Sequence, residues 1–314
     1  MKNIIQTIFK KLKKRKTGTG IFVVSLIILN ILLIAYNAEL KQNENLLQLY
    51  FLNVGQGDSE LVILPGGAKI LIDAGPPNQK IFQELSKILS PFDRTIDLVS
   101  YSHAQQDHMG SLPEVIERYK TSALISNGVG NTIGAYKALK ENVKKQNLQN
   151  IILSRGDKIR YRSSVIRVLS PAQCLDTKCP NIDLNETSLV LLLESASTTA
   201  LFTGDIGKKT ERALLPELAR LASRAKRVEG LHYNQIDVLK VPHHGSKYSS
   251  SKEFLQATNP KIAVIEVGKN SYGHPAKATL EQLQHYNTRI FRTDQDGTVK
   301  VTSDGKSLRI SRIK

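Results

Sequence analysis

The sequence predicts an α/β fold in which two β-sheets pack face to face with helices outside, an αββα sandwich. Two observations lead to this prediction. Apolar β-rich runs separated by glycine and proline turns open each half of the chain, and segments of helical periodicity follow them. Each half of the chain thus has strands first and helices afterwards. Such halves bury the apolar faces of their sheets when the two sheets stack and the helices cover the outer faces.

The first half of the chain begins with short strands that are broken by Gly55, Gly57 and a Pro-Gly-Gly turn at 65–67. Strands and helices then alternate. The expected elements are strands within 48–55, 59–64 and 69–73, helix 79–89, strand 96–101, a helix from Leu112, strand 122–126 and helix 132–146.

The second half repeats this style without repeating the sequence. The expected elements are strands 162–169, 188–194 and 199–203, helix 210–226, strand 236–241, helix 252–258, strand 261–267, helix 277–286 and strands 298–302 and 307–311. The last two strands flank Ser303-Asp304-Gly305, a pattern typical of a β-hairpin.

The N-terminal region is expected to anchor the chain in the cell membrane. Residues 1–20 are basic, and residues 21–38 form an apolar stretch that approaches the ~20 residues needed to span a bilayer. The basic flank stays cytoplasmic, so a linker over 39–47 and a domain over 48–314 would lie outside the cytoplasm. A cleaved signal peptide is the alternative, but bulky Tyr36 stands where such a site needs a small residue.

Composition narrows the class of protein. The apolar fraction of 40% excludes a largely disordered chain. Of the formal net charge of +16, seven positive charges lie in residues 1–16. The remaining surplus favours anionic partners such as nucleic acid or anionic lipid, although a merely basic surface explains it equally well. Cys174 and Cys179 either close a small disulfide loop or remain unpaired thiols.

Metal-competent side chains follow three of the expected strands. Strand 96–101 leads into His103, Asp107 and His108, strand 199–203 leads into Asp205, and strand 236–241 leads into a His-His pair at 243–244. Loops at the carboxyl ends of strands are where α/β proteins place ligands. Nitrogen and oxygen donors of this kind suit zinc, manganese or iron, so these loops predict a metal site.

The same loops resemble the metal motifs of the metallo-β-lactamase superfamily. These motifs are His-x-x-x-Asp-His-x-Gly at 103–110, Thr-Gly-Asp at 203–205 and His-His-Gly at 243–245. More narrowly, VGQGDS (54–59), IDAG (72–75), NETSLV (185–190) and YGHP (272–275) resemble the hydrolase domain of ComEC-type DNA-uptake (competence) proteins. The resemblance runs from about residue 48 to the C-terminus and implies the metallo-β-lactamase sandwich.

The resemblance also implies roles for individual residues. The implied metal ligands are His103, Asp107, His108, Asp205 and His243, with His244 as the alternative to His243. We prefer His243 because it follows the strand first, and Asp205 would bridge two metals if two bind. Asp73 resembles the acid that organises the ligand loop in this family.

Two departures from the family pattern weaken one metal site. Gln105 stands where the family has histidine or aspartate, and an amide oxygen is a poorer ligand. The next metal histidine of the family is also missing, because NETSLVLL occupies its region. We therefore expect one dependable site for Zn or Mn, with Asp107, His108 and Asp205 completed by one histidine of the pair, and a doubtful second site.

The expected function is that of a membrane-anchored metal-dependent hydrolase, a phosphodiesterase or nuclease that acts on DNA outside the cytoplasm. Asp107 and His274 are the expected catalytic residues, although His274 is also explained as a plain turn histidine. Lys247 is expected to bind substrate. The basic segment at 208–227 is either a phosphate track or a solvated or membrane-facing helix.

Two other functions stay open. One is a metal- and nucleic-acid-binding module with little or no turnover, and the other is a hydrolase of a small ester. A single membrane segment cannot itself form a channel, so DNA transport would require a separate membrane channel partner.

Overall fold

The computed structural model describes residues 22, 25–31, 34, 45–172, 183–225 and 235–314. The chain divides into two compact units, Met1–Asn45 and Leu46–Lys314. In the first unit the described residues between 22 and 34 are helical and exposed, and no described helix is long and apolar enough to cross a membrane. The basic segment 1–20, much of the expected span 21–38, and both Cys174 and Cys179 lie outside the described residues.

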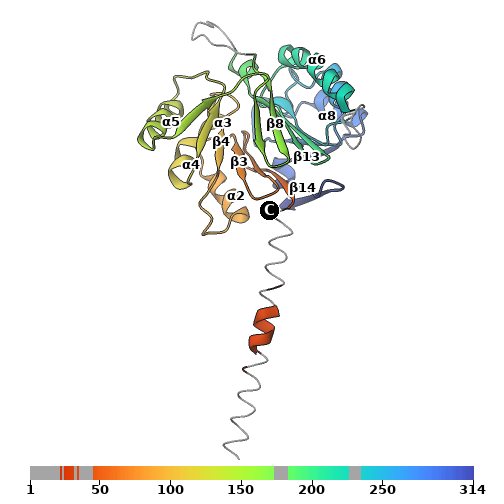
Figure 1. Cartoon of the computed structure of the whole chain (residues 1–314). Coiled ribbons are helices and arrows are strands. Elements are labelled where there is room, and N and C mark those ends of the chain that lie inside the picture. The colour runs from red at the N-terminus through yellow and green to blue at the C-terminus, as the bar shows by residue number, and fades with distance from the viewer. Residues whose placement is uncertain (1–21, 23–24, 32–33, 35–44, 173–182, 226–234) are drawn as a thin grey trace, which may run out of the picture. The chain divides into compact units, whose positions relative to one another are not determined.

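The second unit is built around two sheets (Figure 1). The eight-stranded sheet has the order β15 (Leu308–Ile313), β14 (Thr298–Ser303), β1 (Leu47–Phe51), β2 (Glu60–Ile63), β3 (Lys69–Ile72), β4 (Leu98–Ser100), β5 (Ala123–Ser126), β6 (Gln149–Ile152). The seven-stranded sheet has the order β13 (Arg289–Arg292), β12 (Ile262–Ile265), β11 (Val238–Lys240), β10 (Thr198–Phe202), β9 (Val190–Ser195), β8 (Ser164–Ser170), β7 (Lys158–Tyr161). Strands β3 to β6 run parallel to one another, and so do β10 to β13.

Helices cover the outer face of each sheet (Figure 1). Helices α2 (Lys80–Ile88), α4 (Leu112–Arg118) and α5 (Gly134–Lys145) pack on the eight-stranded sheet. Helices α6 (Lys208–Ala225), α7 (Lys252–Thr258) and α8 (Lys277–His285) pack on the seven-stranded sheet. Short helical segments are α3 (Gln106–Met109), η1 (Leu184–Thr187), η2 (Pro242–Gly245) and α9 (Thr293–Asp296).

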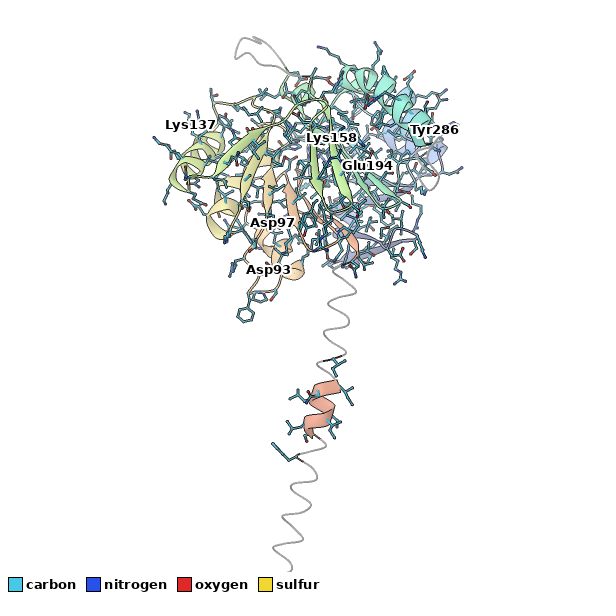
Figure 2. All side chains as sticks on the ribbon, viewed as in Figure 1. Asp93, Asp97, Lys137, Lys158, Glu194 and Tyr286 are labelled. Atoms are coloured by element: carbon cyan, nitrogen blue, oxygen red, sulfur yellow. The ribbon has the colours of Figure 1, made fainter. Side chains whose placement is uncertain are left out.

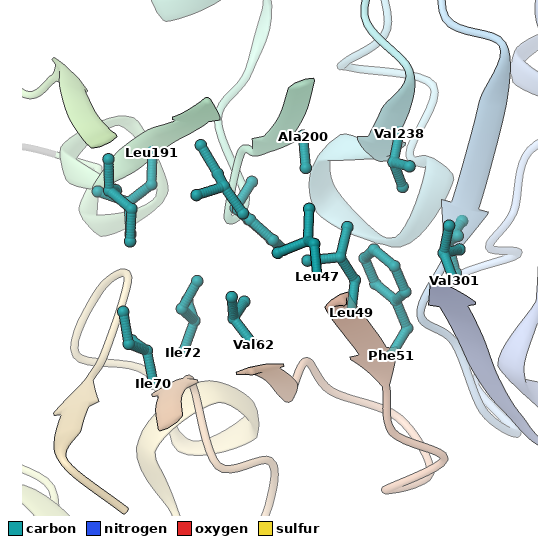
Figure 3. Close-up of a cluster of buried hydrophobic side chains, with 14 of the residues drawn as sticks. Leu47, Leu49, Phe51, Val62, Ile70, Ile72, Leu191, Ala200, Val238 and Val301 are labelled. Atoms are coloured by element: carbon teal, nitrogen blue, oxygen red, sulfur yellow. The ribbon is translucent and has the colours of Figure 1, made fainter. Parts of the chain in front are cut away.

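The main core lies between the two sheets (Figure 3). Leu47, Leu49 and Phe51 alternate along β1 and point into this layer, where they meet residues such as Leu191 and Val238 of the other sheet. The intervening Tyr50 belongs to the cluster under the helices. Alternation with period two therefore supplies apolar side chains to both faces of one strand, as a doubly covered sheet requires.

The predicted αββα sandwich is confirmed, and most expected elements form, including the terminal hairpin of β14 and β15. Strands β6, β7 and β13 were not predicted. Their sequences, QNII, KIRY and RIFR, are short and half polar, and all three are edge strands with mostly exposed or half-buried residues. Edge strands gain their stability from backbone pairing with one neighbour, so the local apolar pattern is weak.

Candidate metal centre

The loops that follow β4, β10 and β11 meet at one edge of the sandwich. Strands β10 and β11 are parallel neighbours and end on the same side of their sheet, and the loop after β4 reaches them from the facing sheet. They enclose a cavity of about 390 Å³. Its lining residues are Gln56, Pro76, Gln105, Gln106, Asp107, Asp205, His243, His244, Tyr272 and His274.

The carboxylate of Asp205 lies at the centre of this site. Its Oδ2 atom is 3.3 Å from His108 Nε2, 3.4 Å from His244 Nε2 and 3.7 Å from His243 Nε2. Asp107 Oδ2 lies 3.4 Å from His244 Nε2. Asp205 is thus in contact with three imidazoles, and Asp107 joins the group through His244.

His103 completes a second group on the same carboxylate. Ligand atoms of His103, His108 and Asp205 all lie within 4.8 Å of one another, and all three residues are buried. Gln105 lines the cavity just before α3, where the family places a stronger ligand. The group around His103 therefore offers three strong donors, and the loop before α3 supplies no strong fourth one.

The geometry favours His244, rather than the preferred His243, as the ligand from the His-His pair. Both residues have left-handed backbone angles, with φ of 50° and 52°, so the tight turn of η2 sends their rings in different directions. The His244 side chain is 2% exposed and lies among the carboxylates, whereas that of His243 is 26% exposed at the cavity wall. Sequence spacing could not separate them because both follow the same strand.

The three buried imidazoles are oriented as metal ligands usually are. The Nε2 atoms of His103, His108 and His244 are buried and have no hydrogen-bond partner among the described residues. The other ring nitrogen has a partner in two of them: His108 Nδ1 lies 2.9 Å from Asp73 Oδ2, and His244 Nδ1 lies 2.7 Å from the Glu266 carbonyl. Buried nitrogens without a hydrogen bond are costly, and a divalent cation would satisfy them, so these residues fit a metal.

The carboxylates control the protonation of these rings when no cation is bound. Burial opposes a charge on His244, but Asp205 and Asp58 outweigh it and raise its pKa to about 10. Burial is likewise outweighed at His108, chiefly by Asp205, and its pKa rises well above the usual value. Burial and the neighbouring His108 lower the pKa of His103 to about 3, so this ring stays neutral.

Asp73 fixes the start of the loop that follows β4 and carries the ligand residues. With a left-handed φ of 54°, it turns its carboxylate back to accept hydrogen bonds of 2.7 Å from both the backbone N–H and the hydroxyl of Ser102. The same carboxylate bonds the ring of His108. This geometry supports the organising role that the family resemblance implies for Asp73.

Lys240 and Asp58 are site residues that the sequence interpretation missed. Lys240 is fully buried, its Nζ atom forms an ion pair with Asp58, and it donates a 2.8 Å hydrogen bond to the Gly204 carbonyl. It also lies 3.5 Å from Asp205 Oδ1. The signal was a lysine within the apolar run VLKV (238–241), which a buried strand tolerates only when the charge is paired.

The VGQGDS loop reaches the site because Gly57 allows close contact. A side chain at Gly57 would meet the Asp107 carbonyl at 2.2 Å, and its φ of 144° also disfavours other residues. Next to it, Asp58 donates its backbone N–H to that carbonyl and places its Oδ1 atom 3.1 Å from His244 Nδ1. This motif therefore contacts Asp107 and His244 and helps to hold both ligand residues in place.

The remaining expected residues lie at the rim. His274 lines the cavity, with its ring centroid 5.6 Å from that of His243 and 5.9 Å from that of Tyr272. Burial and the nearby His243 lower the pKa of His274. Lys247 is exposed, with its Nζ atom 5.1 Å from the Tyr248 ring centroid, and is not among the residues that line the cavity.

Comparison with known proteins agrees with this geometry. Residues 52–172 match the metallo-beta-lactamase superfamily. ComE operon protein 3 of Bacillus subtilis is 31% identical over 268 residues, covering 79% of this chain and 32% of the relative. Recombination protein 2 of Haemophilus influenzae is 26% identical over 271 residues, covering 85% of this chain and 30% of the relative. The chain thus spans about a third of the length of these curated relatives.

A solved structure shows the same fold. The metallo-beta-lactamase fold protein YhfI from Bacillus subtilis superposes with a TM-score of 0.53 at 11% identity, covering 82% of this chain and all of that chain. This likeness concerns the fold alone.

Proposed function

This chain belongs to the metallo-β-lactamase superfamily and is similar to competence proteins, and from that premise we propose that it is a metal-dependent phosphodiesterase or nuclease acting on DNA. The observation that carries the proposal is the convergence of Asp107, His108, Asp205 and His244 at an open cavity. Three imidazole nitrogens at this point are buried without a hydrogen-bond partner among the described residues.

Asp107, His108, Asp205 and His244 would hold the metal ion. Two nitrogen and two oxygen donors suit Zn or Mn, and the second group around His103 would hold another ion less firmly for want of a donor at Gln105. When bound, a divalent cation supplies Lewis acidity, which lowers the pKa of water and stabilises charge on a phosphoryl oxygen.

The residues of the cavity wall are suited to a phosphodiester. The lowered pKa of His274 leaves its ring neutral at pH 7, so one ring N–H can donate a hydrogen bond to a phosphoryl oxygen or to the leaving oxygen. Tyr272 is 75% exposed beside it and offers a face on which a base can stack. Asp107 positions the ligand set through its contact with His244.

Charge favours a polyanion over a neutral substrate. After the basic first 16 residues the chain still carries a surplus of nine positive charges, which attracts DNA in preference to a neutral ester. A small ester substrate would leave both this charge and the exposed Tyr272 without a role.

We place the enzyme at the cell membrane. Residues 1–20 would be cytoplasmic, 21–38 the single-pass anchor, 39–47 a linker and 48–314 a catalytic domain outside the cytoplasm. The basic flank and the helical, apolar residues 26–29 support this topology. Passage of DNA across the membrane would then depend on a separate channel partner.

The test uses the full chain purified in mild detergent and loaded with Zn or Mn. We expect cleavage of single-stranded DNA and of an activated phosphodiester, abolished by chelation and by Asp205→Ala. The matched control Glu141→Ala removes an exposed acid of α5 and should leave cleavage intact. If folded, metal-loaded protein cleaves neither substrate, the proposal is wrong and the chain is a binding module, the function that Gln105 favours.

A further inference from the structure

A second cavity, of about 280 Å³, lies between α6, the start of α7 and α8. Three basic residues line it: Lys208 and Arg212 from α6, and Lys252 from α7. The other lining residues are Leu215, Ser251, Glu253 and Gln282, and none of the seven also lines the metal cavity.

The charge of this basic cavity is not neutralised by its own helix. Lys208 and Arg212 are four residues apart, so they share one face of α6. The acid between them, Glu211, is buried, and its carboxylate accepts backbone N–H groups of Ser250 and Ser251. Glu253 is the one carboxylate in the lining, against three exposed cations.

The basic cavity is attached to two loops of the metal centre. Helix α6 begins three residues after Asp205, so the Cα atoms of Asp205 and Lys208 are within about 11 Å of each other. The backbone N–H of Lys208 donates a 3.1 Å hydrogen bond to the carbonyl of Tyr248, which lies four residues after His244. Tyr248 is 66% exposed, so the loop that is bonded to the start of α6 also carries an exposed aromatic ring.

We propose that the basic cavity binds a backbone phosphate of single-stranded DNA, next along the strand from the phosphate held at the metal centre. This inference rests on the proposed function. The planar guanidinium of Arg212 suits two phosphate oxygens, and Lys208 and Lys252 add point charges. The exposed ring of Tyr248 supplies a surface for base stacking, which favours a nucleic acid strand over a lipid headgroup.

The test measures binding of the full chain, in mild detergent with a chelator present, to a labelled oligothymidine strand over a range of salt concentrations. The double variant Arg212→Gln/Lys252→Gln removes two phosphate contacts. For a single strand we expect the slope of log K against log salt to flatten by about 1.4, and affinity at about 0.1 M salt to fall about 25-fold. Arg212→Lys keeps the charge and should retain the slope.

Matched controls are exposed lysines that do not line the basic cavity. Lys137 extends from α5 and Lys158 from β7 (Figure 2), and Lys137→Gln/Lys158→Gln removes the same charge away from the basic cavity. We expect this control to keep the slope of the parent protein. An unchanged slope in Arg212→Gln/Lys252→Gln, or an equal loss in the control, would overturn the proposal.

Two further outcomes distinguish DNA binding at the basic cavity from lipid binding there and from hydrolysis at the metal centre. If the double variant binds DNA normally but loses retention by micelles that contain phosphatidylglycerol, the basic cavity serves a lipid surface and the inference is wrong. Because the assay excludes metal, a loss of DNA binding in the double variant supports the inference even if the loaded protein shows no cleavage. Failure of the proposed hydrolysis and failure of this inference are thus read from different experiments.

Discussion

Replacing Lys240 with methionine is the sharpest test of how the metal centre is built. The side chain is fully buried, and its ammonium group touches Asp58, the Gly204 carbonyl and Asp205 Oδ1. Methionine has similar length and apolar character, so packing is largely kept while the charge is lost. Asp58 would then be a buried carboxylate without its main cation.

The expected cost follows from that unpaired charge. Removing one partner of a buried ion pair lowers the free energy of unfolding by about 3–5 kcal/mol. The double variant Lys240→Met/Asp58→Asn removes both charges, so we expect its loss to be smaller than the sum of the two single losses by about 1–3 kcal/mol. Urea unfolding of the metal-free full chain, followed by circular dichroism, measures both quantities.

A surface ion pair provides the control. Lys261 is 49% exposed and lies 2.6 Å from Asp237 Oδ1, so Lys261→Met should cost about 1 kcal/mol or less. The reasoning is refuted if Lys240→Met costs no more than Lys261→Met, or if the losses in the double variant simply add. Either result would mean that Lys240 does not neutralise the buried carboxylates.

Three more predictions concern the ligands. His244→Ala should weaken zinc binding far more than His243→Ala, and equal losses in a chelator competition would contradict the geometry. Because the raised pKa values of His108 and His244 keep both rings protonated without metal, zinc binding must release protons; affinity should rise with pH below these pKa values, by up to about 100-fold per unit for two protons. A zinc affinity that does not change with pH would exclude this protonation. His274→Asn should lower kcat on an activated phosphodiester about 10²–10⁴-fold while leaving zinc affinity unchanged, and a parallel loss of zinc would make His274 a ligand instead.

Much of the site could be predicted because its motifs follow strands directly. The loops after β4, β10 and β11 each begin at the end of an apolar run, and the parallel neighbours β10 and β11 end at one edge of their sheet. The loop after β4 comes from the other sheet, so the contact of His108 with Asp205 also requires the face-to-face packing that the αββα prediction supplied. Asp73 follows β3 in the same way. These are properties of short segments, which a single sequence displays.

The charge network behind the ligands could not be predicted in this way. The ion pair of Lys240 with Asp58 joins segments from opposite sheets, and no local periodicity records such a pairing. The choice between His243 and His244 depends on two left-handed residues in one turn, and sequence spacing does not reveal ring direction. Long-range pairing and side-chain direction are set by tertiary packing, so they required the structure.

The buried acids explain why the site holds its shape and also why it should bind a cation. Asp58, Asp73 and Asp205 surround His108, and in the metal-free protein Lys240 and the protonated imidazoles balance their charge. Lys240 keeps its proton and its charge, because the surrounding carboxylates raise its pKa and its ammonium group is buried. The imidazole rings of His108 and His244 can lose a proton from Nε2, an atom that faces the Asp205 carboxylate and has no hydrogen-bond partner among the described residues. A divalent cation that replaces those protons keeps the balance of charge, so binding requires little rearrangement of the carboxylates around it.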